Sequence, residues 1–321
     1  MKEGGVKEKK LNYNMKTKLV TSYYGFHDGP PFWGQLNRDR WYKYSLACIS
    51  ELGSEIVCYT DEGDKGYNQL QEIKEKFNLD NLTIKVYRLE ENPYQERVYN
   101  IRINNPETYN NPDLRHFYCR SQQIYWMKYS FLEMEYESDI NLYWIDSGLS
   151  HNGLFPAYAS RYSVEEDYSN FYNKDGHYIN EYKLYCFDKA FNPSVLEKIN
   201  TYSENKIINL YRNTSDDNYS LFNEKLGLDT NYDSIYPIAG FFGGNSELML
   251  KYITESKQVA EKVLSLGNYL CNEQEIMGYI NATNREWFKN WKFDTFYHED
   301  WTNVYSPNQI SFSHFFLKDL N

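Results

Sequence analysis

Apolar and polar residues follow two different periods along the front third of the chain. Short runs rich in apolar and β-branched residues predict strands at 18–24, 55–60 and 83–89. Between them, apolar residues recur every three or four positions in 36–53 and in 70–77, which predicts two amphipathic helices. Strands that alternate with helices favour right-handed crossovers. The pattern therefore predicts an α/β fold, a three-layer α/β/α sandwich with a mostly parallel central sheet.

The same two periods return further along the chain. Helical spacing of apolar residues predicts a helix over 121–135, and an apolar strand over 140–145 follows it. A later apolar strand ends on two glycines, after which Asn245 or Ser246 can cap an amphipathic helix over 246–263.

Two long segments lack a clear period. Residues 90–115 are rich in Asn, Pro, Arg and Tyr, and we expect an ordered loop there, over the crevice of the sheet. Residues 157–231 are polar and aromatic, and we interpret them as an irregular insertion with short strands around 182–188 and 206–212.

The length and composition narrow the class of protein. We expect a single domain over residues 16–321 and, because residues 1–15 are polar, charged and aperiodic, a disordered leader before it. A net charge of -11 argues against a surface that attracts phosphate backbones, so we expect no nucleic-acid partner. The 33 Tyr and 18 Phe residues either form stacking surfaces for sugars and bases or reflect AT-rich codons.

Five cysteines are scattered along the chain without a CxxC pair, which is typical of a reduced, cytoplasmic protein. The N-terminus lacks the apolar core of a signal peptide, and no run approaches the roughly 20 apolar residues that span a bilayer. We therefore predict a cytoplasmic protein without a transmembrane segment, and leave peripheral association with a membrane open.

The strand over 140–145 ends on an acid, Asp146. In open α/β sheets, ligands bind at the carboxyl ends of the strands, so an aspartate there is a candidate ligand-binding residue. The alternative is a turn former, because Gly148 and Pro156 follow.

Several large enzyme classes lose support because their motifs are absent. The sequence contains no GxxxxGK[ST] loop, no GxGxxG after a strand, no GxSxG and no HExxH. The six histidines lie far apart, so their spacing alone indicates no metal site.

Five short segments carry a resemblance: VTSYYG, YTDEGD, YWIDSG, FFGG and CNEQEIMGYI. Together they resemble glycosyltransferases of the GT-A superfamily, over most of residues 16–300. The front half, with RSQQIYWMKYSFLE before YWIDSG, is similar to bacterial HtrL/YibB-like proteins. The FFGG and NEQ segments are similar to the galactosyltransferase and blood-group transferase family. The resemblance implies a GT-A-like fold with a nucleotide-binding half at 16–150 and an acceptor-side half at 151–321.

The resemblance also implies a metal site. Asp146 matches the first acid of the family's Asp-x-Asp motif, whereas Gly148 stands in place of the second acid. His298 resembles a late histidine ligand, and His151 competes with it because it lies close to Asp146. An oxygen-ligated Mn²⁺ or Mg²⁺ is therefore the expected cofactor, with Asp146 and His298 as ligands and with a metal dependence weakened by Gly148.

Donor binding is expected at the ends of the first two strands, on the helix before Asp146, beside Asp146 and at the two glycines. These candidates are Thr21, Ser22, Tyr23, Asp61, Arg120, Lys128, Asp146, Ser147, Gly148, Gly243 and Gly244. Tyr23 is expected to stack on the base. The alternatives are a loop-opening acid for Asp61, a solvated helix face for Arg120 and Lys128, and a tight turn for the glycine pair.

Glu273 matches the acid of the family's Asp-Glu pair, with Asn272 in place of the aspartate. The resemblance implies a catalytic role beside Asp146, as general base or at the anomeric carbon. The alternative is an acid that stabilises a helix N-terminus.

These observations favour a cytoplasmic glycosyltransferase that moves a sugar from a nucleotide-sugar donor, UDP-linked by our expectation, to a glycan or glycolipid acceptor. The alternative is a non-catalytic carbohydrate-binding or scaffold protein that keeps the fold without its metal site.

Overall fold

A computed structural model of the protein describes nine stretches of the chain. They are residues 15–24, 46–47, 49–105, 126–147, 155–156, 186–187, 193–213, 217–228 and 235–292.

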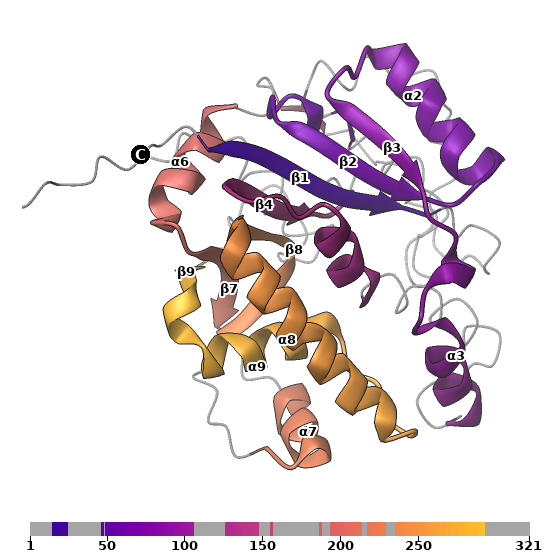
Figure 1. The fold of residues 1–321 in the computed structure, drawn as a ribbon, viewed down its shortest axis with the longest axis vertical. Coiled ribbons are helices and arrows are strands. Elements are labelled where there is room, and N and C mark those ends of the chain that lie inside the picture. The colour runs from indigo at the N-terminus through magenta and orange to yellow at the C-terminus, as the bar shows by residue number, and fades with distance from the viewer. Residues whose placement is uncertain are drawn as a thin grey trace, which may run out of the picture.

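A seven-stranded sheet forms the centre of the described structure (Figure 1). Its strands are β1 (Lys16–Tyr23), β2 (Glu55–Thr60), β3 (Leu82–Val86), β4 (Ile140–Ile145), β7 (Ile207–Asn213), β8 (Ile235–Asn245) and β9 (Phe288–Lys292). They are hydrogen-bonded in the order β3-β2-β1-β4-β8-β7-β9. Strand β8 pairs antiparallel with β4 and β7, and every other pairing is parallel. All strands except β8 therefore run in one direction, which confirms the mostly parallel sheet.

The periodic pattern of the front third corresponds to real elements. The predicted strands are β1, β2, β3 and β4, and the helix predicted over 70–77 is α2 (Gln69–Phe77). Leu70 and Ile73 bury one face of α2, and the chain leaves the helix through Asn78 in the left-handed conformation. Of the helix predicted over 36–53, the described residues 46, 47, 49 and 50 are helical, and Leu46 and Ile49 are buried.

Helices cover both faces of the sheet, which confirms the three layers. Besides α2, the described helices of two turns or more are α3 (Gln95–Asn104), α6 (Ser194–Ser203), α7 (Asp217–Leu226), α8 (Ser246–Ser265), α9 (Glu273–Thr283) and a helix over residues 126–134. Helix 126–134 packs with α3, α7, α8 and α9 in one core, which contains Val20 and Trp144. Helices α2 and α6 pack in a second core, with Leu19 and Tyr143. Neighbouring strand residues thus point into opposite cores. Helix α8 contacts β8 and β4, and Figure 1 shows it in front of β8.

Two expectations for the aperiodic segments were wrong in part. Residues 90–115 contain α3, and the short helix η3 (Leu89–Glu91) lies at their start. Helix α3 escaped detection because it buries little apart from Val98, Ile101 and Arg102, and so shows almost no apolar stripe.

The expected insertion also contains regular structure. The predicted short strands are β6 (Cys186–Phe187), which pairs with β5 (Phe155–Pro156), and β7, which belongs to the central sheet. Helices α6 and α7 flank β7, and two short helices, η2 (Asp64–Asn68) and η5 (Arg285–Trp287), lie elsewhere. Within the described stretches, we find no helix whose length and apolar content would let it cross a membrane.

The strand order reverses between β1 and β4. From β1 the chain adds β2 and then β3 on one side, and it returns to place β4 on the other side of β1. The connections that leave β1 and β4 at their carboxyl ends therefore diverge, which opens a crevice in sheets of this kind. The fold thus favours a ligand site where β1 and β4 end.

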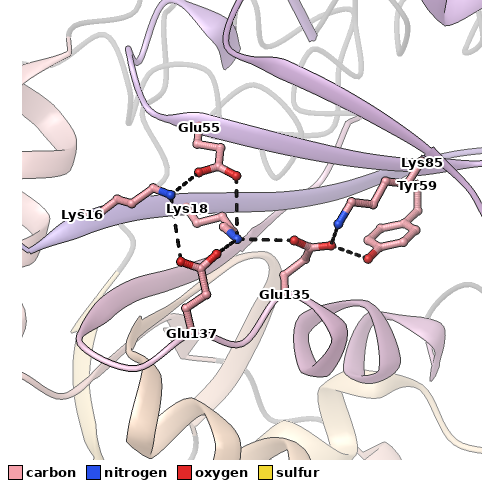
Figure 2. A network of polar contacts seen from close by, with 7 residues as sticks. All are labelled: Lys16, Lys18, Glu55, Tyr59, Lys85, Glu135 and Glu137. Atoms are coloured by element: carbon pink, nitrogen blue, oxygen red, sulfur yellow. Dashed lines mark hydrogen bonds and ion pairs between the residues drawn. The ribbon is translucent and has the colours of Figure 1, made fainter.

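A buried ionic network ties the strands to the segment before β4 (Figure 2). The Glu135 carboxylate contacts the ammonium groups of Lys18 and Lys85, and it accepts a hydrogen bond from the Tyr59 hydroxyl. Lys18 also pairs with Glu55 and Glu137 at the amino ends of the strands. Because Glu135 directly follows helix 126–134, the network fixes the end of that helix against the sheet.

Candidate functional site

Asp146 directly follows β4, at the edge where the strand order reverses. Its backbone N–H donates to the Gly240 carbonyl oxygen at 2.8 Å, which holds the residue against β8. Its Oδ1 accepts a hydrogen bond from the Trp144 indole Nε1–H at 2.6 Å. The side chain is 33% exposed, so part of the carboxylate faces away from the protein. Asp146 is therefore an anchored carboxylate with an open side, at the position predicted for it.

Lys128 points from helix 126–134 toward Asp146, and its ammonium is buried. The Nζ atom lies 3.4 Å from Asp146 Oδ1, 3.0 Å from Glu273 Oε1 and 3.2 Å from the Ala239 carbonyl oxygen. Burial by itself lowers the pKa of Lys128, but the charges of Asp146 and Glu273 outweigh it and leave that pKa above its usual value. The residue is therefore a buried cation between two carboxylates.

Glu273 is the first residue of α9, and its carboxylate is buried. The N-terminus of α9 is capped by other groups: the Asn272 side chain and the Glu275 carboxylate form a capping box. Glu275 Oε2 accepts from the Asn272 backbone N–H at 2.7 Å. The capping hydrogen bonds therefore come from Asn272 and Glu275, and the bonded partner of Glu273 is Lys128. The place of Glu273 in the first turn of α9 still fits the alternative of an acid that stabilises a helix N-terminus.

The carboxyl ends of β1 and β4 are joined across the point of reversal. Ser147 Oγ donates a hydrogen bond to the Ser22 carbonyl oxygen at 2.7 Å, and both residues are buried. Thr21 lies fully buried one residue earlier in β1. These three predicted donor-binding residues thus lie at one edge of the sheet with Asp146.

Tyr23 has a different environment from the one expected of it. Its ring is 2% exposed and packs in the core on the α2 face, where the hydroxyl donates to Gln69 Oε1 at 2.9 Å. Burial raises the pKa of the Tyr23 hydroxyl above its usual range. The ring offers no exposed face to a base, so its position does not fit the predicted stacking.

Asp61 follows β2 at the same edge. Its Oδ1 accepts from the Glu62 backbone N–H at 3.3 Å, and its carbonyl oxygen accepts from the Tyr67 N–H at 3.0 Å. These contacts close the turn into η2, as the loop-opening alternative predicts, and they leave a donor role untested.

The glycine pair is explained by strand packing. Gly243 and Gly244 lie inside β8, with φ of 144° and 153°. A Cβ on Gly243 would lie 2.2 Å from the Leu142 carbonyl oxygen, and one on Gly244 would lie 2.1 Å from that of Lys206. They pair with Tyr143 and Leu142 in the middle of β4, whereas Asp146 follows its carboxyl end. The tight-turn alternative is therefore wrong, since β8 continues to Asn245, which caps α8 as predicted, and the donor contact of the glycines stays a prediction.

Three predicted site residues, Arg120, Gly148 and His298, lie outside the described residues, as does the competing His151. Among the residues that are described, no three His, Cys, Asp or Glu side chains are grouped so as to hold a metal ion. Asp146 fits one ligand position of a hard cation, because its carboxylate is anchored through Oδ1 and partly exposed.

Sequence reasoning missed the role of Trp144. It lies two residues before Asp146, so both side chains leave the strand on the same side. The ammonium of Lys128 lies 5.1 Å from the centre of its ring, over the ring face. The spacing of two residues was the available signal, but an indole in a buried strand is more often a simple core residue.

The comparisons with known proteins are distant. No protein-family model matches the sequence, and no curated protein matches it either. A crystal structure of the galactosyltransferase LgtC, in complex with donor and acceptor sugar analogues, is similar with a TM-score of 0.39 and 10% sequence identity. The match covers 85% of this chain and 73% of that chain. At that TM-score the likeness is too distant to inform the chemistry of the site.

Proposed function

We propose that the protein is a glycosyltransferase that moves a sugar from a nucleotide-sugar donor, UDP-linked, to a glycan or lipid-linked acceptor. One observation supports this most: Asp146, Lys128 and Glu273 meet at the carboxyl edge of the central strands, beside the point where the strand order reverses. That edge is where open α/β sheets bind nucleotides.

Asp146 is the group that faces the donor. A nucleotide-sugar donor leaves as a diphosphate, so negative charge builds on its oxygens in the transition state and needs a cation nearby. A divalent metal would supply that charge, held by Asp146 and, as the resemblance implies, by His298. The backbone at the ends of β1 and β4, joined through Ser22 and Ser147, would position the donor.

Glu273 is the proposed general base for the acceptor hydroxyl. Lys128 donates a hydrogen bond to its Oε1, so the second oxygen, Oε2, is the one that would accept the proton of the acceptor hydroxyl. Because Glu273 comes from the segment after β8 and Asp146 from the segment before it, donor and acceptor would meet between the two halves of the chain.

A specific observation also favours the non-catalytic alternative, a carbohydrate-binding protein. Lys128 and Glu273 form an ion pair inside the protein, so both charged groups already have a partner other than a substrate. Such a protein would bind a sugar or nucleotide sugar and leave it intact.

The test is a thermal-shift screen of nucleotide sugars with and without Mn²⁺, followed by assays of donor hydrolysis and transfer. A ligand that binds the native state at about 100 times its Kd adds roughly 2.7 kcal/mol to the free energy of unfolding. We expect UDP-sugars to raise the Tm and to be hydrolysed slowly. Stabilisation without hydrolysis or transfer would support the binding protein, and no stabilisation by any nucleotide sugar would refute the proposed function.

A further inference from the structure

The hydrogen-bonding capacity of Lys128 is fully used inside the protein. An ammonium group donates three hydrogen bonds, and three acceptors surround the Nζ atom: Glu273 Oε1, Ala239 O and Asp146 Oδ1, at 3.0, 3.2 and 3.4 Å. The side chain is 2% exposed. A phosphate or sugar would therefore have to displace one of these partners to contact Lys128.

The same ammonium neutralises two acids that come from distant parts of the chain. Glu273 is nearly as buried as Lys128, and an unpaired carboxylate there would be strongly unfavourable. With Lys128 in place, both carboxylates share one cation. Their separation is then set by the position of a single Nζ atom.

That position is fixed from two sides. Helix 126–134 ends at the Glu135 network, which anchors it to β1 and β3 (Figure 2). On the sheet side, the Trp144 ring packs below the ammonium, and its Nε1–H donates to the same Oδ1 of Asp146. A buried polar network in which every donor and acceptor has a hydrogen-bond partner is rigid. The two carboxylates therefore move little relative to each other.

We infer that Lys128 is a positioning residue that couples Asp146 to Glu273 and does not itself contact the donor. It holds the partly exposed carboxylate of Asp146 and the buried carboxylate of Glu273 at a constant distance and orientation. This inference rests on the proposed function for the reaction that the two acids serve, but the coupling itself can be measured without any substrate.

The experiment places Glu273→Gln in two backgrounds, the wild-type protein and Lys128→Met, and measures the Tm of all four forms. In the wild-type background the substitution removes a charge that Lys128 needs, so the Tm falls. In the Lys128→Met background it removes an uncompensated buried charge, so the Tm rises, on the order of 5 °C or more. Lys18→Met is the matched control, because Lys18 is also a buried lysine in ion pairs, away from Glu273. Glu273→Gln should lower the Tm in that background as it does in the wild type.

If Lys128→Met alone does not fold, a folded double variant supports the coupling and an unfolded one overturns it. A double variant that melts at or below Lys128→Met also overturns the inference. Lys128→Arg keeps the charge but moves it, and misplacement of reacting groups by about 1 Å can slow a reaction roughly a hundredfold. We therefore expect its kcat to fall with the KM for the donor nearly unchanged, whereas a KM effect alone would mean that Lys128 contacts the donor. A wild-type protein that transfers no sugar would refute the proposed function and leave the Tm comparison intact as a test of the coupling.

Discussion

The ammonium of Lys128 lies 3.0 Å from Oε1 of Glu273, and both side chains are buried. Lys128 belongs to helix 126–134, before β4, and Glu273 to α9, the second helix after β8, so the ion pair bridges the two halves of the chain. Removing one partner of a buried pair generally costs about 3–5 kcal/mol, because the other charge stays in a poorly solvated place.

Asp146→Asn tests whether the exposed carboxylate serves a ligand. Asparagine keeps an oxygen that can accept from the Trp144 indole, as well as the shape of the turn. We expect a folded protein with a lowered Tm, because Lys128 loses one of its two charged partners, together with loss of metal-dependent donor binding and of nearly all transfer. Calorimetry of donor binding with and without Mn²⁺ measures this, and transfer that survives with its metal dependence intact would return Asp146 to the role of a turn former.

Glu273→Gln tests the proposed general base. The glutamine side chain can still accept a hydrogen bond from Lys128 but cannot take a proton, so we expect folded, less stable protein whose transfer rate is at least about a hundredfold lower. Glu275→Gln is the control, because Glu275 lies in the same helical turn and caps α9. It should lose roughly 1 kcal/mol of stability and keep its turnover. Equal turnover in both variants would leave Glu273 with a structural role alone.

Gly244→Ala tests the assignment of the glycine pair to strand packing. The new Cβ would lie 2.1 Å from the Lys206 carbonyl oxygen, a contact that requires the backbone of β7 or β8 to move. We expect a loss of roughly 3 kcal/mol or more in denaturant unfolding. Gly267→Ala is the comparison: its φ is 72°, but its Cβ would meet nothing within 4 Å, so about 1 kcal/mol should be lost. Donor affinity of the folded Gly244→Ala protein should be unchanged, and a specific loss of donor affinity would restore the site assignment.

Glu135→Gln tests the ionic network that joins Glu135 to Lys18, Tyr59 and Lys85 on β1, β2 and β3. Burial by itself raises the pKa of Glu135, but hydrogen bonds from Lys85 and Tyr59, with the charges of Lys85 and Lys18, lower it below its usual value. A carboxylate whose folded pKa is depressed stabilises the protein above the unfolded pKa of about 4.3 and loses that effect as the pH falls through the folded pKa.

The stability difference between wild type and Glu135→Gln should therefore be largest at neutral pH and shrink below about pH 4. Urea unfolding at pH 7 and pH 3 measures it. The matched control is Glu62→Gln, which removes an exposed ion pair with Arg88 and should stay close to the wild type at both values. A difference that is constant with pH would mean that Glu135 acts through packing.

The sequence by itself determined the elements whose side chains repeat with a regular period. Strands β1, β2 and β4 and helices α2 and α8 were predicted because their buried faces follow from local spacing. Asp146 was recognisable for the same reason, since an acid at the end of a strand buried on both faces marks a known edge of a parallel sheet. Helix α3 was missed because few of its side chains are buried, so its sequence shows no apolar residues at helical spacing.

Only the tertiary structure decided which distant residues meet. No local pattern indicates that Lys128 pairs with Glu273, because that contact depends on the reversed strand β8, which brings α9 next to helix 126–134. The burial of Tyr23 and the steric need for Gly243 and Gly244 likewise depend on neighbouring strands. Spacing along a chain specifies which face a side chain occupies, whereas the partner on that face is set by how the sheet is assembled.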